Sequence, residues 1–136
     1  MRPEVFVDAG AWIAVAHARD QHHARAVDVY PRLLRESLRL VTTNLVIGEA
    51  HAVLMRKVGI GPALEFLDRV FSSGRIELVH PDRTLTAEAL ALLRQYRGQG
   101  FSLADAVSFA LMRLRGIETA FAFDRNFAAA GFRLTP

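Results

Sequence analysis

The hydrophobic positions of this chain fall into two kinds of segment that alternate along its length. Short apolar runs, typical of buried strands, occupy residues 4–8, 38–43, 75–81 and 117–124. Longer stretches with apolar residues at helical spacing occupy 9–19, 21–39, 44–59, 61–74, 84–100 and 102–116. A short helix is expected over 125–131, and residues 132–136 form a candidate edge strand.

Proline, asparagine and glycine mark several of the expected boundaries. Pro31 lies inside the segment 21–39 and should kink or split that helix, because proline has no backbone N–H and clashes with the preceding turn. Pro62 suits the first turn of the helix over 61–74. Asn44 is a candidate N-cap for the helix over 44–59, and Gly59 is a candidate for its end.

This alternation predicts an α/β fold with a parallel sheet that carries helices on both faces. The length of 136 residues suits one domain that spans 1–136. In such folds ligands bind at the carboxyl ends of the strands. Asp8 is expected at the end of the first strand and Asp124 at the end of the fourth.

Composition excludes several classes of protein. Hydrophobic residues make up 51% of the chain, enough for a sizeable core, yet no apolar run approaches the ~20 residues of a membrane span. The first residues do not resemble a signal peptide. Without cysteine the chain has neither disulfides nor thiolate metal sites, and a cytoplasmic location is expected.

The net charge of +3 comes from 17 basic and 14 acidic residues, and Lys57 is the single lysine. Arginine binds phosphate through two hydrogen bonds and stacks on bases, so this bias is compatible with nucleic acid. The same bias also arises in chains encoded by GC-rich genomes. The basic residues are scattered, and Arg113, Arg115 and Arg125 are candidate phosphate contacts or solvated helix-face charges.

Four acids stand in unusually apolar company: Asp8 in "VFVDAGAW", Glu49 in "NLVIGEAHAVL", Asp105 in "FSLADAVSFAL" and Asp124 in "AFAFDRNF". Each has a structural alternative. Asp8 and Asp124 could be helix N-caps. Ser102 and Asp105 match a capping box. Glu49 falls near a helix N-terminus, where the macrodipole favours negative charge.

Together the four acids point to a cation site. Carboxylates that converge at one sheet edge raise one another's pKa unless a cation lies between them. Mg²⁺ and Mn²⁺ prefer carboxylate and water oxygens, and they suit phosphoryl chemistry. The chain offers no P-loop, no G-x-G-x-x-G motif and no cysteine nucleophile as a rival site. The five histidines are expected to be structural or solvated.

At this point the chain resembles PIN-domain ribonucleases, especially the small toxins of VapBC toxin–antitoxin pairs. The resemblance spans almost the whole chain and rests on "VFVDAGAW", "TTNLVIGEAHAVL", "FSLADAVSFAL" and "AFAFDRNFAAAGF", in that order. It implies a three-layer α/β/α sandwich around a parallel sheet of about five strands. It also implies that Asp8, Glu49, Asp105 and Asp124 bind Mg²⁺ or Mn²⁺ as catalytic residues that cut RNA, with Asp8 and Asp105 as the most direct ligands.

The resemblance further implies an RNA substrate, a small antitoxin as partner and a homodimer. Two positions depart from the family's pattern. Gly10 stands where members often carry Ser or Thr, and Ala122 stands where they often carry Thr. Both hydroxyls could orient a ligand or a water.

The absence of hydroxyl groups at Gly10 and Ala122 leaves open a second interpretation: an inactive PIN-like module that binds RNA or protein. A haloacid-dehalogenase-like phosphatase is disfavoured, because that chemistry needs a second Asp where Gly10 stands.

Overall fold

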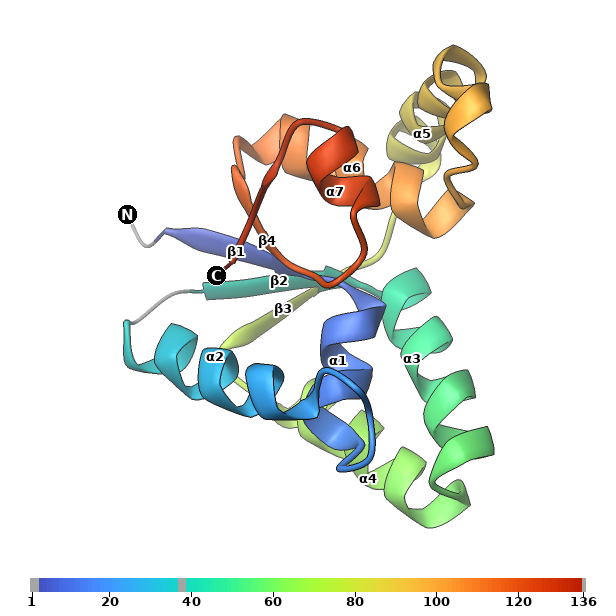
Figure 1. Ribbon diagram of the computed structural model, residues 1–136. Coiled ribbons are helices and arrows are strands. Elements are labelled where there is room, and N and C mark those ends of the chain that lie inside the picture. Colours follow the sequence, from blue (N-terminus) through green and yellow to red (C-terminus); the bar gives the residue numbers. More distant parts are fainter. Residues whose placement is uncertain (1–2, 37–38, 136) are drawn as a thin grey trace.

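The computed structural model describes residues 3–36 and 39–135 and confirms the α/β class (Figure 1). Its sheet has five strands in the order β3-β2-β1-β4-β5, and every neighbouring pair is parallel. The strands are β1 (Glu4–Val7), β2 (Arg39–Thr43), β3 (Ile76–Val79), β4 (Thr119–Phe121) and β5 (Arg133–Leu134). Since all strands run the same way, the segments that follow them meet at one edge, the carboxyl edge.

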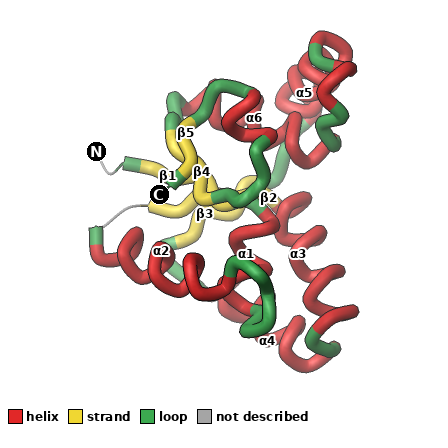
Figure 2. The backbone as a smooth tube through the Cα atoms, in the orientation of Figure 1, coloured by secondary structure: helices red, strands yellow, loops and turns green. Residues whose placement is uncertain are grey.

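Helices connect the strands and cover both faces of the sheet. They are α1 (Ala9–Ala16), α2 (His23–Arg35), α3 (Asn44–Lys57), α4 (Ile60–Ser72), α5 (Arg83–Gln95), α6 (Leu103–Arg115) and α7 (Asn126–Ala129), with a 3₁₀ turn at Arg97–Gln99. Helices α1, α2 and α4 lie on one side of the sheet, and α6 and α7 lie on the other (Figure 1). Figure 2 shows the strands gathered between these helices, as the expected three-layer sandwich requires.

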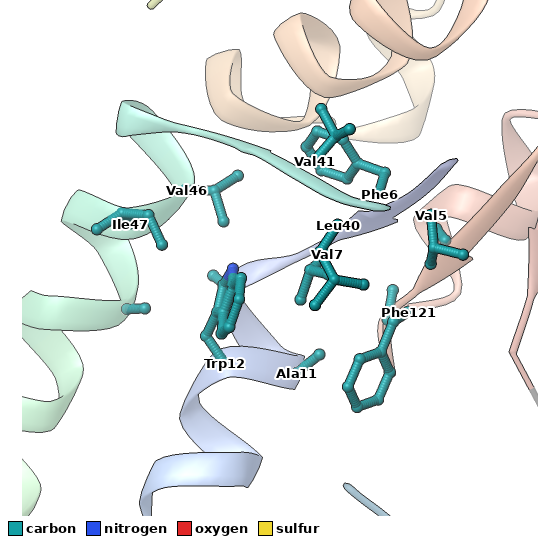
Figure 3. Close-up of a cluster of buried hydrophobic side chains, with 14 of the residues drawn as sticks. Val5, Phe6, Val7, Ala11, Trp12, Leu40, Val41, Val46, Ile47 and Phe121 are labelled. Atoms are coloured by element: carbon teal, nitrogen blue, oxygen red, sulfur yellow. The ribbon is translucent and has the colours of Figure 1, made fainter. Parts of the chain in front are cut away.

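The central strands are buried on both faces, which explains why their sequences are continuous apolar runs and do not alternate. Phe6 and Val41 point to one side of the sheet, and Val7 and Leu40 point to the other (Figure 3). All four are fully buried. The Phe6 ring stacks on Phe127 at a centroid distance of 6.0 Å, so it ties β1 to α7.

Proline does not split α2, which was one of the two outcomes expected from the sequence. The helix runs without a break from His23 to Arg35, with Pro31 inside it. Pro31 is exposed, and so is Val27, whose carbonyl loses its helical partner to the proline. Water can bind that carbonyl, which explains why the helix tolerates the ring.

Several expected boundaries were wrong by a few residues. Helix α1 ends at Ala16 and not at 19, because His17 adopts extended backbone angles. Helix α5 ends at Gln95 and not at 100. The N-cap of α3 is Thr43, whose hydroxyl accepts from the N–H of Val46, and Asn44 is the first helical residue. The expected strand over 38–43 begins at residue 39 in the described part, since residues 37–38 lie outside it.

At the amino edge of the sheet, oppositely charged side chains alternate. Arg115, at the end of α6, donates from Nη1 to Glu4 at 3.3 Å and to Glu77 at 3.0 Å, and its Nη2 also contacts Glu77. Arg39 lies 3.3 Å from Glu77. The hydrogen bonds from Arg115 lower the pKa of Glu77. Arg115 is therefore a structural clamp between β1 and β3 and not a phosphate contact.

The helices of the described residues are too short or too polar to span a membrane.

Candidate active site

Asp8 directly follows β1 at the carboxyl edge of the sheet, and the neighbouring strands are β2 and β4. Its N–H donates to the carbonyl of Phe121 at 3.0 Å, which continues the pairing of β1 with β4. Its carbonyl accepts from the N–H groups of Ala11 and Trp12, so Asp8 occupies the N-cap position of α1 through its backbone. The carboxylate itself makes no capping hydrogen bond. The N-cap explanation therefore accounts for the place of Asp8 but not for its charge.

A buried polar network holds Asp8 in place. The hydroxyl of Thr42, on β2, donates to the carbonyl of Val7 at 2.9 Å. The same hydroxyl accepts from the indole N–H of Trp12, on α1, at 3.3 Å. This network ties β1, β2 and α1 together next to Asp8. Thr42 thus supports the site, although its sequence context did not single it out.

Glu49 reaches the site from the second turn of α3. The residue is exposed, unlike Asp8. Its pKa is nevertheless raised, first by partial burial and then by the negative charges of Asp105 and Asp124. Helix α3 therefore places Glu49 near Asp105 and Asp124.

Asp105 lies in the first turn of α6 and forms the predicted capping box with Ser102. Its N–H donates to the hydroxyl of Ser102 at 3.0 Å, and its Oδ2 accepts from the N–H of Ser102 at 3.1 Å. The same Oδ2 also accepts from the side-chain amide of Asn126 at 3.3 Å. Asp105 thus caps its helix and faces the site at the same time, so the two explanations do not exclude each other.

Asp124 follows β4 by three residues, because the strand ends at Phe121 and not at 124 as expected. Its Oδ1 accepts from the backbone N–H of Asn126 at 2.9 Å, and its Oδ2 accepts from the Asn126 amide at 3.3 Å. The N-cap position of α7 belongs to Arg125, so Asp124 is not the expected N-cap. Asn126 bridges Asp124 to Asp105, and only its position two residues after Asp124 hinted at this.

The four acids influence one another through space. The pKa of Asp8 is raised to about 7, mainly by burial. The N–H of Ala9 partly offsets this rise, and the charges of Asp105, Glu49 and Asp124 add to it. With the charged form of Asp8 disfavoured, a cation at this edge would stabilise all four carboxylates. The charges of Asp105, Glu49 and Asp124 thus act on Asp8, as expected for acids at one edge of the sheet.

The donor set fits a hard divalent cation, although it is an open arrangement. Within residues 3–36 and 39–135, no three Asp, Glu or His side chains are close enough together to hold a metal by themselves. Mg²⁺ commonly binds through one or two carboxylates and completes its shell with waters and substrate phosphates. The residues present are compatible with that kind of site and not with a closed all-protein cage.

The two positions that depart from the family's pattern differ in their surroundings. Gly10 lies in the first turn of α1, and a Cβ atom at this position would meet nothing within 4 Å. Ala122 is 4% exposed and packs within the core beside the site. The structure therefore has room for the Cβ atom of a serine or threonine at position 10.

Comparisons with known proteins agree with this architecture. The family model described as "PIN domain" matches residues 5–133. The chain is 35% identical over 129 residues to the 23S rRNA-specific endonuclease VapC20 of Mycobacterium tuberculosis, covering 94% of this chain and 95% of the relative. The crystal structure of that organism's VapC20, described as a sarcin-ricin loop cleaving toxin, has a TM-score of 0.84 at 33% identity, covering 94% of this chain and 95% of that one.

A more distant structure shares the fold alone. VapBC2 from Rickettsia felis, bound to a DNA fragment from its promoter, has a TM-score of 0.67 at 12% identity, with 97% of each chain covered. The family match covers nearly the whole chain, and the mycobacterial relative exceeds 30% identity over almost its full length. This chain therefore belongs to the PIN domain family.

Proposed function

We propose that this protein is a divalent-metal-dependent endoribonuclease and the toxin of a toxin–antitoxin pair. The observation that carries the proposal is that four carboxylates, from the β1–α1 junction, α3, α6 and the β4–α7 segment, lie near enough for their charges to add to the raised pKa of Asp8. Such a cluster is unfavourable near RNA phosphates unless a cation is bound, so it has little use outside metal-dependent chemistry.

In this proposal Asp8 and Asp105 are the direct ligands of Mg²⁺ or Mn²⁺, while Glu49 and Asp124 act through water or at a second ion. The ion supplies Lewis-acid activation of the phosphodiester and of the attacking water. Asp8 is fixed by its backbone bonds and by the Thr42 network. Its burial keeps bulk water from screening the attraction between the carboxylate and a bound cation.

The carboxylates also handle the protons. A carboxylate with a pKa near neutrality is suited to accept a proton from water at physiological pH. Glu49, which is not a direct ligand in this proposal, has a pKa raised by partial burial and by the charges of Asp105 and Asp124, so it is the proposed proton acceptor. Asn126 donates to both Asp105 and Asp124 and so fixes which oxygens of these two acids remain available.

RNA is the substrate class that the relatives support. The relative at 35% identity is a 23S rRNA-specific endonuclease, and its solved counterpart is described as cleaving the sarcin-ricin loop. We therefore propose structured ribosomal RNA as the first substrate to test. This substrate places the proposed activity in the cytoplasm.

The proposal is tested by incubating the purified protein with 23S rRNA and, separately, with total RNA, in Mg²⁺, Mn²⁺ or EDTA. We expect discrete cleavage with either metal and none with EDTA. The Asp8→Asn and Asp105→Asn variants should lose at least about 10²-fold in rate, since each loses a proposed ligand. Cleavage by these variants at the wild-type rate would reject the role of the four acids.

One alternative keeps some support: a PIN-like module that binds RNA or protein without cutting it. The absence of hydroxyl groups at Gly10 and Ala122 favours this alternative. Metal binding by calorimetry, together with no cleavage of any RNA pool, would favour the module over the nuclease.

An antitoxin is the proposed protein partner, and an apolar groove supports it. The groove is lined by Trp12 and Val15 of α1, Tyr30 of α2, and Phe66 and Val70 of α4, among others. Its volume is about 320 Å³, which suits side chains of an inserted helix or strand. If a short reading frame lies beside this gene, co-expression of the two products, followed by pull-down, tests the pairing.

A homodimer, implied by the family resemblance, belongs to the same proposal. Two large apolar side chains on the α5–α6 pair support it, because Leu114 is 76% exposed and Leu90 is 41% exposed. Light scattering during size-exclusion chromatography gives the oligomeric state. The Leu114→Glu variant should then shift the protein to a monomer, since a charge would be desolvated at the interface.

A further inference from the structure

A second groove lies beside the acids and has the opposite character. It is lined by His22 and Arg25 at the start of α2, by Phe123 and Arg125 on either side of Asp124, and by Leu134 and Thr135 at the end of the sheet. Its volume is about 650 Å³, and none of the described residues that line it is acidic. The site's acids and this basic, aromatic groove therefore share the segment after β4.

Two aromatic rings form a ready-made stacking surface in this groove. The imidazole of His22 lies parallel to the ring of Phe123, with 4.3 Å between centroids and 3° between planes. Phe121 packs edge-on against Phe123 at 5.8 Å and supports it from the core. The backbone N–H of His22 donates to Asp20 at 2.9 Å, which fixes the loop that presents the imidazole. The rings are thus positioned before any ligand arrives.

Two guanidinium groups flank the ring pair. Arg25 and Arg125 are exposed, and within residues 3–36 and 39–135 neither makes an ion pair or a side-chain hydrogen bond. Arg115 shows the contrast, because it spends its donors on Glu4 and Glu77. An arginine without an internal partner is available for phosphate oxygens or for the face of a base.

We propose that this groove, the His22–Phe123 groove, binds the unpaired strand of the RNA substrate next to the scissile phosphate. One base stacks on the His22–Phe123 pair, and the phosphates beside it contact Arg25 and Arg125. The proposal rests on the proposed function and adds the surface that holds the substrate. Aromatic stacking with flanking cations is the common way in which proteins hold single-stranded nucleic acid without reading its sequence.

The path of the RNA strand follows from the order of residues along the protein chain. Phe123 and Arg125 are the direct neighbours of Asp124, so an RNA strand whose scissile phosphate lies at the acids passes the groove beside them. An acidic protein segment would fit the arginines equally well, but it would be repelled by the carboxylates beside them. RNA bound through a metal at the acids meets no such conflict.

The test measures RNA binding separately from cleavage. A fluorescein-labelled RNA hairpin that carries the sarcin-ricin loop is titrated in Mg²⁺ into the Asp8→Asn protein, and anisotropy gives the affinity. In this background, Phe123→Leu should weaken binding about tenfold, whereas Phe123→Trp should retain it. The double variant Arg25→Gln/Arg125→Gln should weaken binding by at least about tenfold and should lower the slope of log K against log salt by about 1.4.

Arg94→Gln, on the exposed face of α5, is the matched control for the loss of a charge and should leave the affinity unchanged. If both groove variants bind like their parent, the groove proposal is overturned. If they bind weakly although the wild-type protein cleaves no RNA, the groove stands and the proposed nuclease function fails. The arginine pair is exposed, so it decides the question even if Phe123→Leu disturbs folding.

The wild-type background gives a second readout. Groove variants should raise KM for RNA and leave kcat within about threefold, because they hold the substrate and do not touch the reacting phosphate. A lowered kcat with unchanged KM would contradict a substrate-holding role.

Discussion

The indole N–H of Trp12 donates to the hydroxyl of Thr42 across 30 positions of sequence, at 3.3 Å. The same hydroxyl donates to the carbonyl of Val7, directly before Asp8. Thr42 is completely buried, so both hydrogen bonds of its hydroxyl are difficult to replace by water. This pairing makes Thr42 a support for the acid at the end of β1.

We expect Thr42→Val to lower the free energy of unfolding by about 2 kcal/mol, because it leaves the Trp12 N–H buried without an acceptor. RNA cleavage should fall as Asp8 loses its fixed position. Thr42→Ser keeps the hydroxyl and is the matched control, with a loss of about 1 kcal/mol from the missing methyl group. Urea denaturation measures both values, and equal losses in the two variants would contradict the network.

Neutralising Asp8 should stabilise the metal-free protein at high pH. In the folded protein Asp8 keeps its proton up to a pH of about 7, whereas in the unfolded chain it loses the proton near its ordinary pKa of 3.8. The folded state thus binds more protons within this window, so its stability falls as the pH rises through it and stays low above. Asp8→Asn has no such loss.

In EDTA at pH 8, Asp8→Asn should therefore be more stable than wild type by on the order of 2–4 kcal/mol, with little difference at pH 4. Asp28→Asn, which neutralises an exposed acid on α2, should change stability by less than about 0.5 kcal/mol at either pH. Denaturation curves at the two pH values supply the measurement. A destabilised Asp8→Asn at pH 8 would show that Asp8 is charged and well solvated in the folded state.

Metal should reverse this order. A cation that binds the folded protein and not the unfolded chain raises Tm in proportion to the logarithm of its concentration. We expect Mg²⁺ or Mn²⁺ to raise the Tm of the wild-type protein at pH 8 and to leave Asp8→Asn nearly unchanged. Thermal scans at increasing metal concentration test this without any RNA. Parallel shifts of both proteins would place the bound ion away from Asp8.

Asn126 should matter because it is the single side-chain donor that bridges two of the acids among the described residues. Asn126→Asp replaces this donor with a fifth negative charge, so both stability at pH 8 and cleavage should fall. Asn126→Ala removes the bridge alone and should cost about 1 kcal/mol. If Mg²⁺ restores Asn126→Asp beyond wild type, the added carboxylate has become a ligand and the bridging role is wrong.

Gly10 offers a direct way to restore the hydroxyl that the family often carries. Among the described residues, a Cβ atom at Gly10 would meet no atom of another segment within 4 Å, and glycine weakens a helix relative to alanine by about 0.5–1 kcal/mol. Gly10→Ala should therefore raise stability without raising the cleavage rate. Gly10→Ser should raise the rate severalfold if a hydroxyl orients a ligand. Identical rates for the two variants would show that the hydroxyl is dispensable.

Much of the fold could be predicted because strands and helices differ in the spacing of their apolar residues. This spacing is clear in residues 4–8 and 44–59. The position of Asp8 followed from the strand it ends. Boundaries were less predictable, since the end of α1 depends on the extended backbone of His17 and not on residue type. Pro31 was misjudged because its effect depends on which side of α2 faces water.

The candidate site shows the same division. Four acids in apolar surroundings could be found from local sequence, and the capping box of Ser102 and Asp105 followed from its spacing. The bridge through Asn126 joins two helices that begin 23 residues apart, at 103 and 126, so no local pattern records it. Pairings of this kind need the tertiary structure.

The two edges of the sheet differ in how their charged side chains are paired. At the amino edge Glu4, Arg39, Glu77 and Arg115 alternate in sign and neutralise one another. At the carboxyl edge the four acids share one sign. Within the described part of the chain the two groups share no hydrogen-bond or ion-pair partner, so changes at one edge and changes at the other should be nearly additive. An engineer could thus strengthen the ionic clamp around Arg115 to offset the instability of the acidic edge, and evolution could do the same.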